Sequence, residues 1–252
     1  MSLAEVVCIA LAGMAAGTIN TVVGSGTLIT FPVLLAFGYA PVTANVSNTI
    51  GLVPGSVSGA IGYRAELRGQ RERALRLGSM SVLGGITGAA LLLVLPASAF
   101  KEIVPVFIAA ALVLTLAQPR INAWLVRRQI ELHRPHHPLT AGAVYLTGVY
   151  GGYFGAAQGI LLLAILGVAL DQSLQRTNAL KNVLAGLVNG VAGLYFVFAA
   201  PHIAWGPAAV IAVAAIVGGQ LGARYGRRLP PEALRALIVV VGVAAIVQLV
   251  TS

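Results

Sequence analysis

Two groups of polar residues interrupt apolar stretches of the sequence, and their side chains have the chemistry to bind a small solute. In chain order they are Asn45, Asn48 and Thr49 in the first half, and Asn178, Lys181 and Asn182 in the second. Members of a group are three or four positions apart, so they would share one face of a helix. Amide N–H groups and one ammonium are hydrogen-bond donors, which suit the oxygens of a small anion. The pattern predicts two helix faces that bind an oxyanion.

Each polar group follows an apolar run that glycines break. The first break consists of Gly24, Ser25, Gly26 and Thr27, and the second ends in Gln158 and Gly159. Freed backbone groups are tolerated at membrane depth only where they line a cavity, and a helix that restarts there directs its N–H groups into it. We expect both breaks to supply donors to one central site. The alternative is that these glycines serve only tight helix packing.

The side chains of the two polar groups would have different roles in such a site. Their four asparagines would orient the oxygens of the solute, and Lys181 would offset its charge. The alternative for Lys181 is that its long side chain reaches the nearby membrane surface. Asn189 lies deeper in the same apolar stretch. We expect it to pair with a neighbouring helix, with a place in the solute path as the alternative.

The elements that must position these residues are membrane-spanning helices. The chain has 252 residues, of which 58% are hydrophobic and 9% charged, whereas a soluble domain carries about 25% charged residues. Apolar runs at 73–95, 102–119, 177–199 and 232–250 approach or reach the roughly 20 residues that a helix needs to cross a bilayer. They lack the alternation of β-barrel strands. The expected fold class is an all-α membrane protein, a polytopic helical bundle in a lipid bilayer.

The sequence repeats itself. Gly26 aligns with Gly159 and Asn45 with Asn178 at one spacing, and 84–89 aligns with 218–223 one residue further on. An ordered series of matches with a single one-residue shift indicates duplication. We therefore predict a first transmembrane repeat at 1–119, a basic linker at 120–137 and a second transmembrane repeat at 138–252. Each repeat would contain a broken helical hairpin and three spanning helices.

The arginines predict how the repeats are oriented. They cluster at 63–76, 120–137 and 224–228, whereas the opposing loops 39–44, 96–101 and 200–206 hold only Lys101 and His202 as basic residues. Because cytoplasmic loops are enriched in basic residues, we expect the three arginine clusters in the cytoplasm and both termini outside. Equivalent loops of the two repeats then face opposite sides. This is an inverted repeat, which many secondary transporters contain around a midplane site.

Several functions are disfavoured by what the sequence lacks. Its acidic residues lie at segment ends or in loops, which argues against a proton relay through a buried carboxylate. The net charge of +9 comes from loop arginines rather than one basic face, so we expect no nucleic-acid binding. His133, His136 and His137 lack supporting ligands, so we expect no metal. Without a phosphate-binding or nucleophile motif, the chain is expected to use no cofactor and not to be an enzyme.

The two breaks and the segments after them resemble a known family. The pattern from Gly24 to Pro32, followed by 44–48, is similar to the TauE/SafE sulfite exporter family, and so is the second copy at 176–182. The resemblance covers nearly the whole chain. It implies a carrier of the bacterial inner membrane that exports sulfite, sulfonates or related small organic anions.

The sequence thus favours one function over two alternatives. The leading hypothesis is a secondary transporter that exports a small sulfur-containing or organic oxyanion by alternating access. A passive anion channel could use the same donors, and the chain could instead be the membrane subunit of a larger complex. The expected partners are a small anionic solute and the bilayer, with a homo-oligomer left open.

Overall fold

The structure, a computed structural model, describes residues 1–128, 137–226 and 231–251, and all regular secondary structure within these ranges is α-helical. The helices are α1 (Leu3–Val22), α2 (Thr27–Ala36), α3 (Pro41–Gly62), α4 (Arg71–Val94), α5 (Ala97–Arg128), α6 (His137–Tyr153), α7 (Gln158–Ala169), α8 (Leu174–Ala199), α9 (Trp205–Tyr225) and α10 (Pro231–Thr251). The predicted all-α fold class is confirmed.

In the part of the chain that the structure describes, five helices are long and apolar enough to cross a membrane: α1, α4, α8, α9 and α5 as far as Leu125. The predicted multi-spanning character is therefore confirmed. The helices α2 and α7 have only 10 and 12 residues, which is short of the roughly 20 residues that a span requires. They are the second arms of the two predicted broken hairpins.

Local sequence explains where the helices around the breaks begin. Pro41 opens α3, where its fixed φ and missing N–H group suit the first helical turn. Ser173 precedes α8, and its Oγ accepts a hydrogen bond from the backbone N–H of Arg176 at 3.4 Å. Pro41 and Ser173 each lie just before a predicted polar group. By fixing where the helix begins, they determine the direction in which the side chains of that group point.

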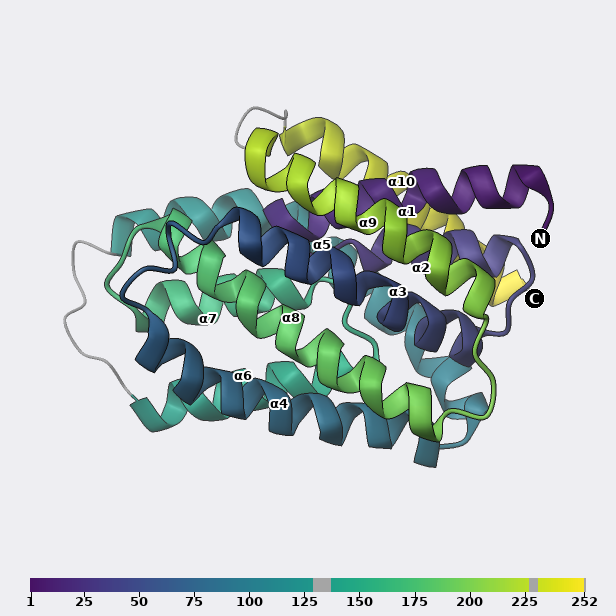
Figure 1. Cartoon of the computed structure of the whole chain (residues 1–252), viewed down its shortest axis with the longest axis horizontal. Helices are drawn as coiled ribbons and strands as arrows, with labels where there is room; N and C mark the ends of the chain where they lie inside the picture. Colours follow the sequence, from purple (N-terminus) through teal and green to yellow (C-terminus); the bar gives the residue numbers. More distant parts are fainter. Residues whose placement is uncertain (129–136, 227–230, 252) are drawn as a thin grey trace.

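The ten helices follow one order twice, α1 to α5 and α6 to α10, and the two sets interleave (Figure 1). Helix α1 packs along α9 while α6 packs along α4, and the contacts of α3 with α9 are matched by those of α8 with α4. The central pair is α3 and α8. Every one of these contacts joins the first half of the chain to the second.

Two equivalent glycines allow the outer helix pairs to approach closely. A Cβ on Gly84 of α4 would lie 2.3 Å from the carbonyl oxygen of Tyr145 on α6. A Cβ on Gly218 of α9 would lie 2.1 Å from the carbonyl oxygen of Met14 on α1. The sequence aligned these two glycines, and both contacts need a residue without a side chain.

The connections of the bundle gather at two ends. Loops 63–70 and 170–173 lie at one end, whereas loops 37–40 and 200–204 lie at the other together with both termini (Figure 1). At the first end the Nη2 of Arg176 donates to the carbonyl of Arg68 at 2.9 Å. We call it the basic end. The membrane orientation predicted from the arginines stays a prediction, and Arg134, Arg227 and Arg228 lie outside the described residues.

The predicted division at residues 119 and 137 also stays a prediction. Helix α5 continues to Arg128, so the first part of the expected linker extends a helix of the first repeat. The remainder, at 129–136, lies outside the described residues, as do His133 and His136. In the described part of the chain, no group of three or more His, Cys, Asp or Glu residues is placed to hold a metal ion.

Candidate functional site

The two helix breaks meet in the interior of the bundle. The backbone N–H of Gly159, at the start of α7, donates to the carbonyl oxygen of Gly24, just after α1, at 3.1 Å. A Cβ on Gly24 would lie only 2.4 Å from the Cα of Gly159. Gly24 has a φ of +93°, a left-handed conformation that favours glycine. The sequence predicted two breaks, and the structure brings them into backbone contact.

Side chains of the preceding helices hold the unwound segments in place. The Oδ1 of Asn20 accepts a hydrogen bond from the backbone N–H of Gly26 at 2.7 Å. In the other break the hydroxyl of Tyr150 donates to the carbonyl of Ala156 at 2.5 Å. Ala157 follows with a φ of +59°, the only positive φ of a non-glycine residue among those described. These bonds satisfy backbone groups that the interrupted helices leave without partners.

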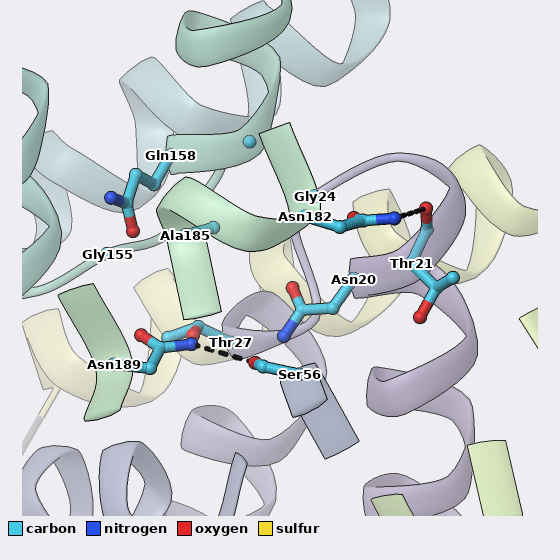
Figure 2. A pocket seen from close by; sticks show the side chains of 11 residues that line it. Asn20, Thr21, Gly24, Thr27, Ser56, Gly155, Gln158, Asn182, Ala185 and Asn189 are labelled. Atoms are coloured by element: carbon cyan, nitrogen blue, oxygen red, sulfur yellow. Dashed lines mark hydrogen bonds between the residues drawn. The ribbon is translucent and has the colours of Figure 1, made fainter. Parts of the chain in front are cut away.

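A small cavity lies where the breaks meet α3 and α8 (Figure 2). Its volume is about 30 Å³, which is room for about two water molecules. The residues that line this central cavity are Asn20, Thr21, Gly24, Thr27, Ser56, Gly155, Gln158, Gly159, Asn182, Ala185 and Asn189. All are uncharged, so the cavity wall is polar but contains no carboxylate.

The polar face of α8 is directed at the C-terminal end of α1. The Nζ of Lys181 donates to the carbonyls of Asn20 at 3.1 Å and Thr21 at 3.4 Å. The Nδ2 atoms of Asn178 and Asn182 donate to the same Thr21 carbonyl at 3.2 and 3.3 Å. Lys181 has no exposed surface, so it does not extend to the membrane surface as the alternative interpretation required.

The polar face of α3 makes the corresponding contacts in the other half. The Nδ2 of Asn45 donates to the carbonyl of Tyr153, the last residue of α6, at 2.9 Å. The amide of Asn48 bonds to Thr27 and Thr30 of α2. Thr49 is buried beside them. The two asparagines that the sequence aligned, Asn45 and Asn178, thus hold the C-terminal ends of equivalent helices.

The predicted site residues therefore divide into two layers. Those that line the central cavity are Gly24, Thr27, Gln158, Gly159 and Asn182. The remaining predicted residues are buried but do not line the cavity, and they are Ser25, Gly26, Asn45, Asn48, Thr49, Asn178 and Lys181. Within the wall, the Nε2 of Gln158 is buried and has no hydrogen-bond partner. It is a donor available to a bound solute.

Six lining residues were not predicted as part of the site: Asn20, Thr21, Ser56, Gly155, Ala185 and Asn189. The Nδ2 of Asn189 donates to the Oγ of Ser56 at 3.3 Å, which confirms the predicted pairing of Asn189 with a neighbouring helix (Figure 2). Ser56 and Asn189 are separated by the same number of residues as Asn45 and Asn178. That repeat spacing was the sequence signal that could have identified Ser56.

Comparison with known proteins places the chain in a family. The family described as Sulfite exporter TauE/SafE matches residues 9–249. A probable membrane transporter protein, ORF9, of Sinorhizobium sp is 26% identical over 95% of this chain and 90% of its own length. The probable membrane transporter protein YfcA of Escherichia coli K12 is 26% identical over 90% of this chain and 83% of its own. A probable membrane transporter protein of Haemophilus influenzae is 23% identical over 90% of this chain and 88% of its own.

No solved structure matches the chain. The family match nevertheless extends over both breaks, both polar groups and the spanning helices around them. Its relatives are membrane transporters by name and not enzymes. The protein is a multi-pass membrane transporter, and the chain belongs to the sulfite exporter TauE/SafE family.

Proposed function

We propose that the protein is a secondary carrier of the bacterial inner membrane that exports a small sulfur-containing or organic oxyanion, such as sulfite or a sulfonate. The observation that carries the proposal is the position of Lys181. It is a fully buried lysine whose ammonium contacts the carbonyls of two residues, Asn20 and Thr21, that line the central cavity.

Charge in the interior favours an anion. A buried ammonium is costly unless other groups stabilise it, and the hydrogen-bond partners of Lys181 are the carbonyls at the C-terminal end of α1. Carbonyl dipoles there carry only partial negative charge, and no lining residue is acidic. When Lys181 is protonated, the centre of the bundle therefore carries a positive charge that a small anion would offset.

Neutral donors around the cavity suit the oxygens of such an anion. The free Nε2 of Gln158 and the amides of Asn182 and Asn189 belong to residues that line the cavity (Figure 2). Asn182 and Asn189 are already held by hydrogen bonds to Thr21 and Ser56, so they would bind an anion without much loss of side-chain freedom. The cavity of about 30 Å³ is too small to be a section of an open pore, so its size favours a carrier over a passive channel.

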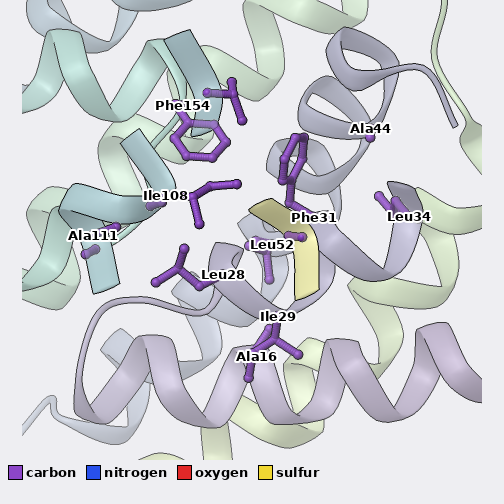
Figure 3. Close-up of a cluster of buried hydrophobic side chains, with 14 of the residues drawn as sticks. Ala16, Leu28, Ile29, Phe31, Leu34, Ala44, Leu52, Ile108, Ala111 and Phe154 are labelled. Atoms are coloured by element: carbon purple, nitrogen blue, oxygen red, sulfur yellow. The ribbon is translucent and has the colours of Figure 1, made fainter. Parts of the chain in front are cut away.

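Differences between the two ends of the bundle support alternating access. An aromatic cluster lies between the breaks and the end of the bundle that holds the termini. It consists of Phe31, Phe100, Phe107, Tyr153 and Phe154. The rings of Phe31 and Phe154 meet edge to face with centroids 5.2 Å apart (Figure 3). Such packing excludes water and solute. A carrier would open this side by separating the aromatic side chains.

Uptake by purified protein in liposomes tests the proposal. Radiolabelled sulfite should accumulate with saturable kinetics, and Lys181→Gln should reduce the initial rate at least about tenfold because it keeps a donor but removes the charge. Lys101→Gln is the matched control, since Lys101 is exposed at the other end of the bundle. An unchanged rate in Lys181→Gln protein of normal folded yield would show that Lys181 does not take part in binding the solute. Flux that does not saturate would favour the channel.

A further inference from the structure

A second and larger cavity lies at the basic end of the bundle. Its volume is about 390 Å³, and its lining includes Tyr63, at the start of the 63–70 loop, and Gln175, in the first turn of α8. Further polar lining comes from Gln118 and Asn122 of α5. Arg235 of α10 is the only charged residue among the lining residues that the structure describes. A small oxyanion would fit there together with several of its waters.

Three of the polar atoms around this cavity are buried and have no hydrogen-bond partner within the protein. The Nε of Arg235 is buried and has no hydrogen-bond partner. The Oδ1 atoms of Asn122 and Asn178, which line the same cavity, are also buried without partners. Buried polar groups left unsatisfied are costly. A guanidinium and nearby carbonyl-type oxygens would all be satisfied by an oxyanion that brings its own bound water.

Only a thin wall separates this cavity from the central one. On α1, Thr21 lines the central cavity, whereas the next two residues, Val22 and Val23, line the second cavity. On α8, Asn182 lines the central cavity and Asn178, one turn earlier, lines the second. Both amides donate to the Thr21 carbonyl, at 3.3 and 3.2 Å. The contact between Asn178 and Thr21 is therefore the barrier between the two cavities.

We propose that the second cavity is an anion-binding vestibule in which Arg235 holds the solute before it passes the Asn178–Thr21 contact. The vestibule opens at the end of the bundle where the arginines gather, opposite the aromatic cluster. Arginine suits this role because its planar fork of donors matches the oxygens of sulfite or a sulfonate. The inference rests on the proposed function for the identity of the solute, but the charge preference of the cavity can be measured without it.

Reaction of an introduced cysteine measures that preference. In a Cys8→Ser background, Gln118→Cys should react faster with an anionic methanethiosulfonate reagent than with a trimethylammonium one, after normalisation to free thiol. Arg235→Gln should shrink this ratio about tenfold, because a cationic side chain in the wall of a cavity raises the local concentration of anions. Ala65→Cys, exposed in the 63–70 loop of the same end, is the control, and its ratio should not respond to Arg235→Gln.

Two results would overturn the vestibule. One is a Gln118→Cys thiol that neither reagent modifies in folded protein, which would mean that the cavity is closed to solutes. The other is a charge preference that persists in Arg235→Gln. Both readouts stand even where the wild type fails to transport sulfite, an outcome that would count against the proposed function alone.

Two further measurements distinguish a transported solute from a lipid headgroup as the anion that Arg235 binds: transport assays and cysteine modification in liposomes of different lipid composition. In sulfite uptake, Arg235→Gln should raise KM about tenfold with a smaller change in the maximal rate, and Arg235→Lys should recover part of the loss. Methanesulfonate, which neither consumes the thiosulfonate reagents nor cleaves their disulfide products as sulfite does, should also slow Gln118→Cys modification in liposomes of phosphatidylcholine alone. If phosphatidylglycerol slows the modification and the added solute does not, Arg235 binds a lipid headgroup. The solute vestibule would then be wrong.

Discussion

Gly24 and Gly159 lie on different halves of the chain and share a backbone hydrogen bond of 3.1 Å between the Gly159 N–H and the Gly24 carbonyl. A Cβ on Gly159 would lie 2.5 Å from the Cα of Gly24. This contact closes one wall of the central cavity. Because both glycines line the cavity, a substitution that disturbs this contact should affect transport.

Gly159→Ala should block transport by forcing the breaks apart. The added methyl meets backbone, which cannot move as a flexible side chain can, and overpacking of this kind costs about 1–3 kcal/mol. Gly190→Ala in α8 is the control, because a Cβ there would meet nothing within 4 Å. We expect a lower unfolding temperature in detergent and a lost sulfite uptake for Gly159→Ala only. If the two variants had the same unfolding temperature and the same sulfite uptake, the close contact between Gly24 and Gly159 would not be needed for stability or transport.

Phe31→Ala should open the end of the bundle that the aromatic cluster seals. Phe31 is fully buried and packs edge to face on Phe154, and loss of a buried phenyl ring costs about 3–5 kcal/mol. In Cys8→Ser protein with Gln158→Cys as the reporter, an impermeant thiol reagent added on the side of the termini should react faster once Phe31 is alanine. Leu194→Ala, an exposed residue of α8, should leave the rate unchanged. A rate that Phe31→Ala does not alter would exclude the cluster as the seal.

The predicted inversion of the two repeats can be tested by accessibility. Ala65 and His202 lie in loops at opposite ends of the bundle (Figure 1). In a Cys8→Ser background, Ala65→Cys should react with an impermeant reagent only from the cytoplasmic side and His202→Cys only from the other side. Labelling of intact cells and of inverted vesicles distinguishes the sides. Modification of both residues from one side would show that the two loops face the same compartment, and the predicted inverted topology would be wrong.

Tyr39 and Glu5 supply a contact whose pH dependence can be measured. The Tyr39 hydroxyl, between α2 and α3, donates to Glu5 Oε1 at 2.6 Å, and this bond, with burial and the nearby charge, raises the pKa of Tyr39 from 10.0 to about 12. A raised folded-state pKa contributes stability that is present below the unfolded value and is lost as pH rises through the folded one. The wild type should therefore lose its stability advantage over Tyr39→Phe between pH 10 and about 12.

Thermal unfolding of the two proteins across that pH range checks this expectation, and ultraviolet difference absorbance follows the phenolate itself. Tyr225→Phe, a substitution at an exposed tyrosine of α9, serves as the control. A stability difference between wild type and Tyr39→Phe that stays constant through this range would show that the Glu5 contact does not hold the Tyr39 proton.

The sequence by itself determined that this protein is built from helices and where two of them break. A chain with 9% charged residues cannot cover a water-facing surface, so its apolar runs had to be helices in a bilayer. Glycines at 24 and 159 marked the breaks because glycine is the residue that permits such close backbone approach. The three- and four-residue spacing of Asn45, Asn48 and Thr49 placed them on one face. These features depend on local geometry, which neighbours in the chain specify.

Only the tertiary structure decided which groups those faces meet. The donors of Lys181 and Asn178 were expected to point at a solute, but they bond to the end of α1, a helix more than a hundred residues away in the sequence. Arg235 lies 134 residues after Lys101, which is the spacing that aligns 84–89 with 218–223, yet Lys101 is exposed while Arg235 lines a cavity. Helical periodicity defines the face on which a residue lies, whereas the partner across that face depends on how the two halves interleave. That packing is a property of the whole bundle, because each helix finds its main contacts in the other half.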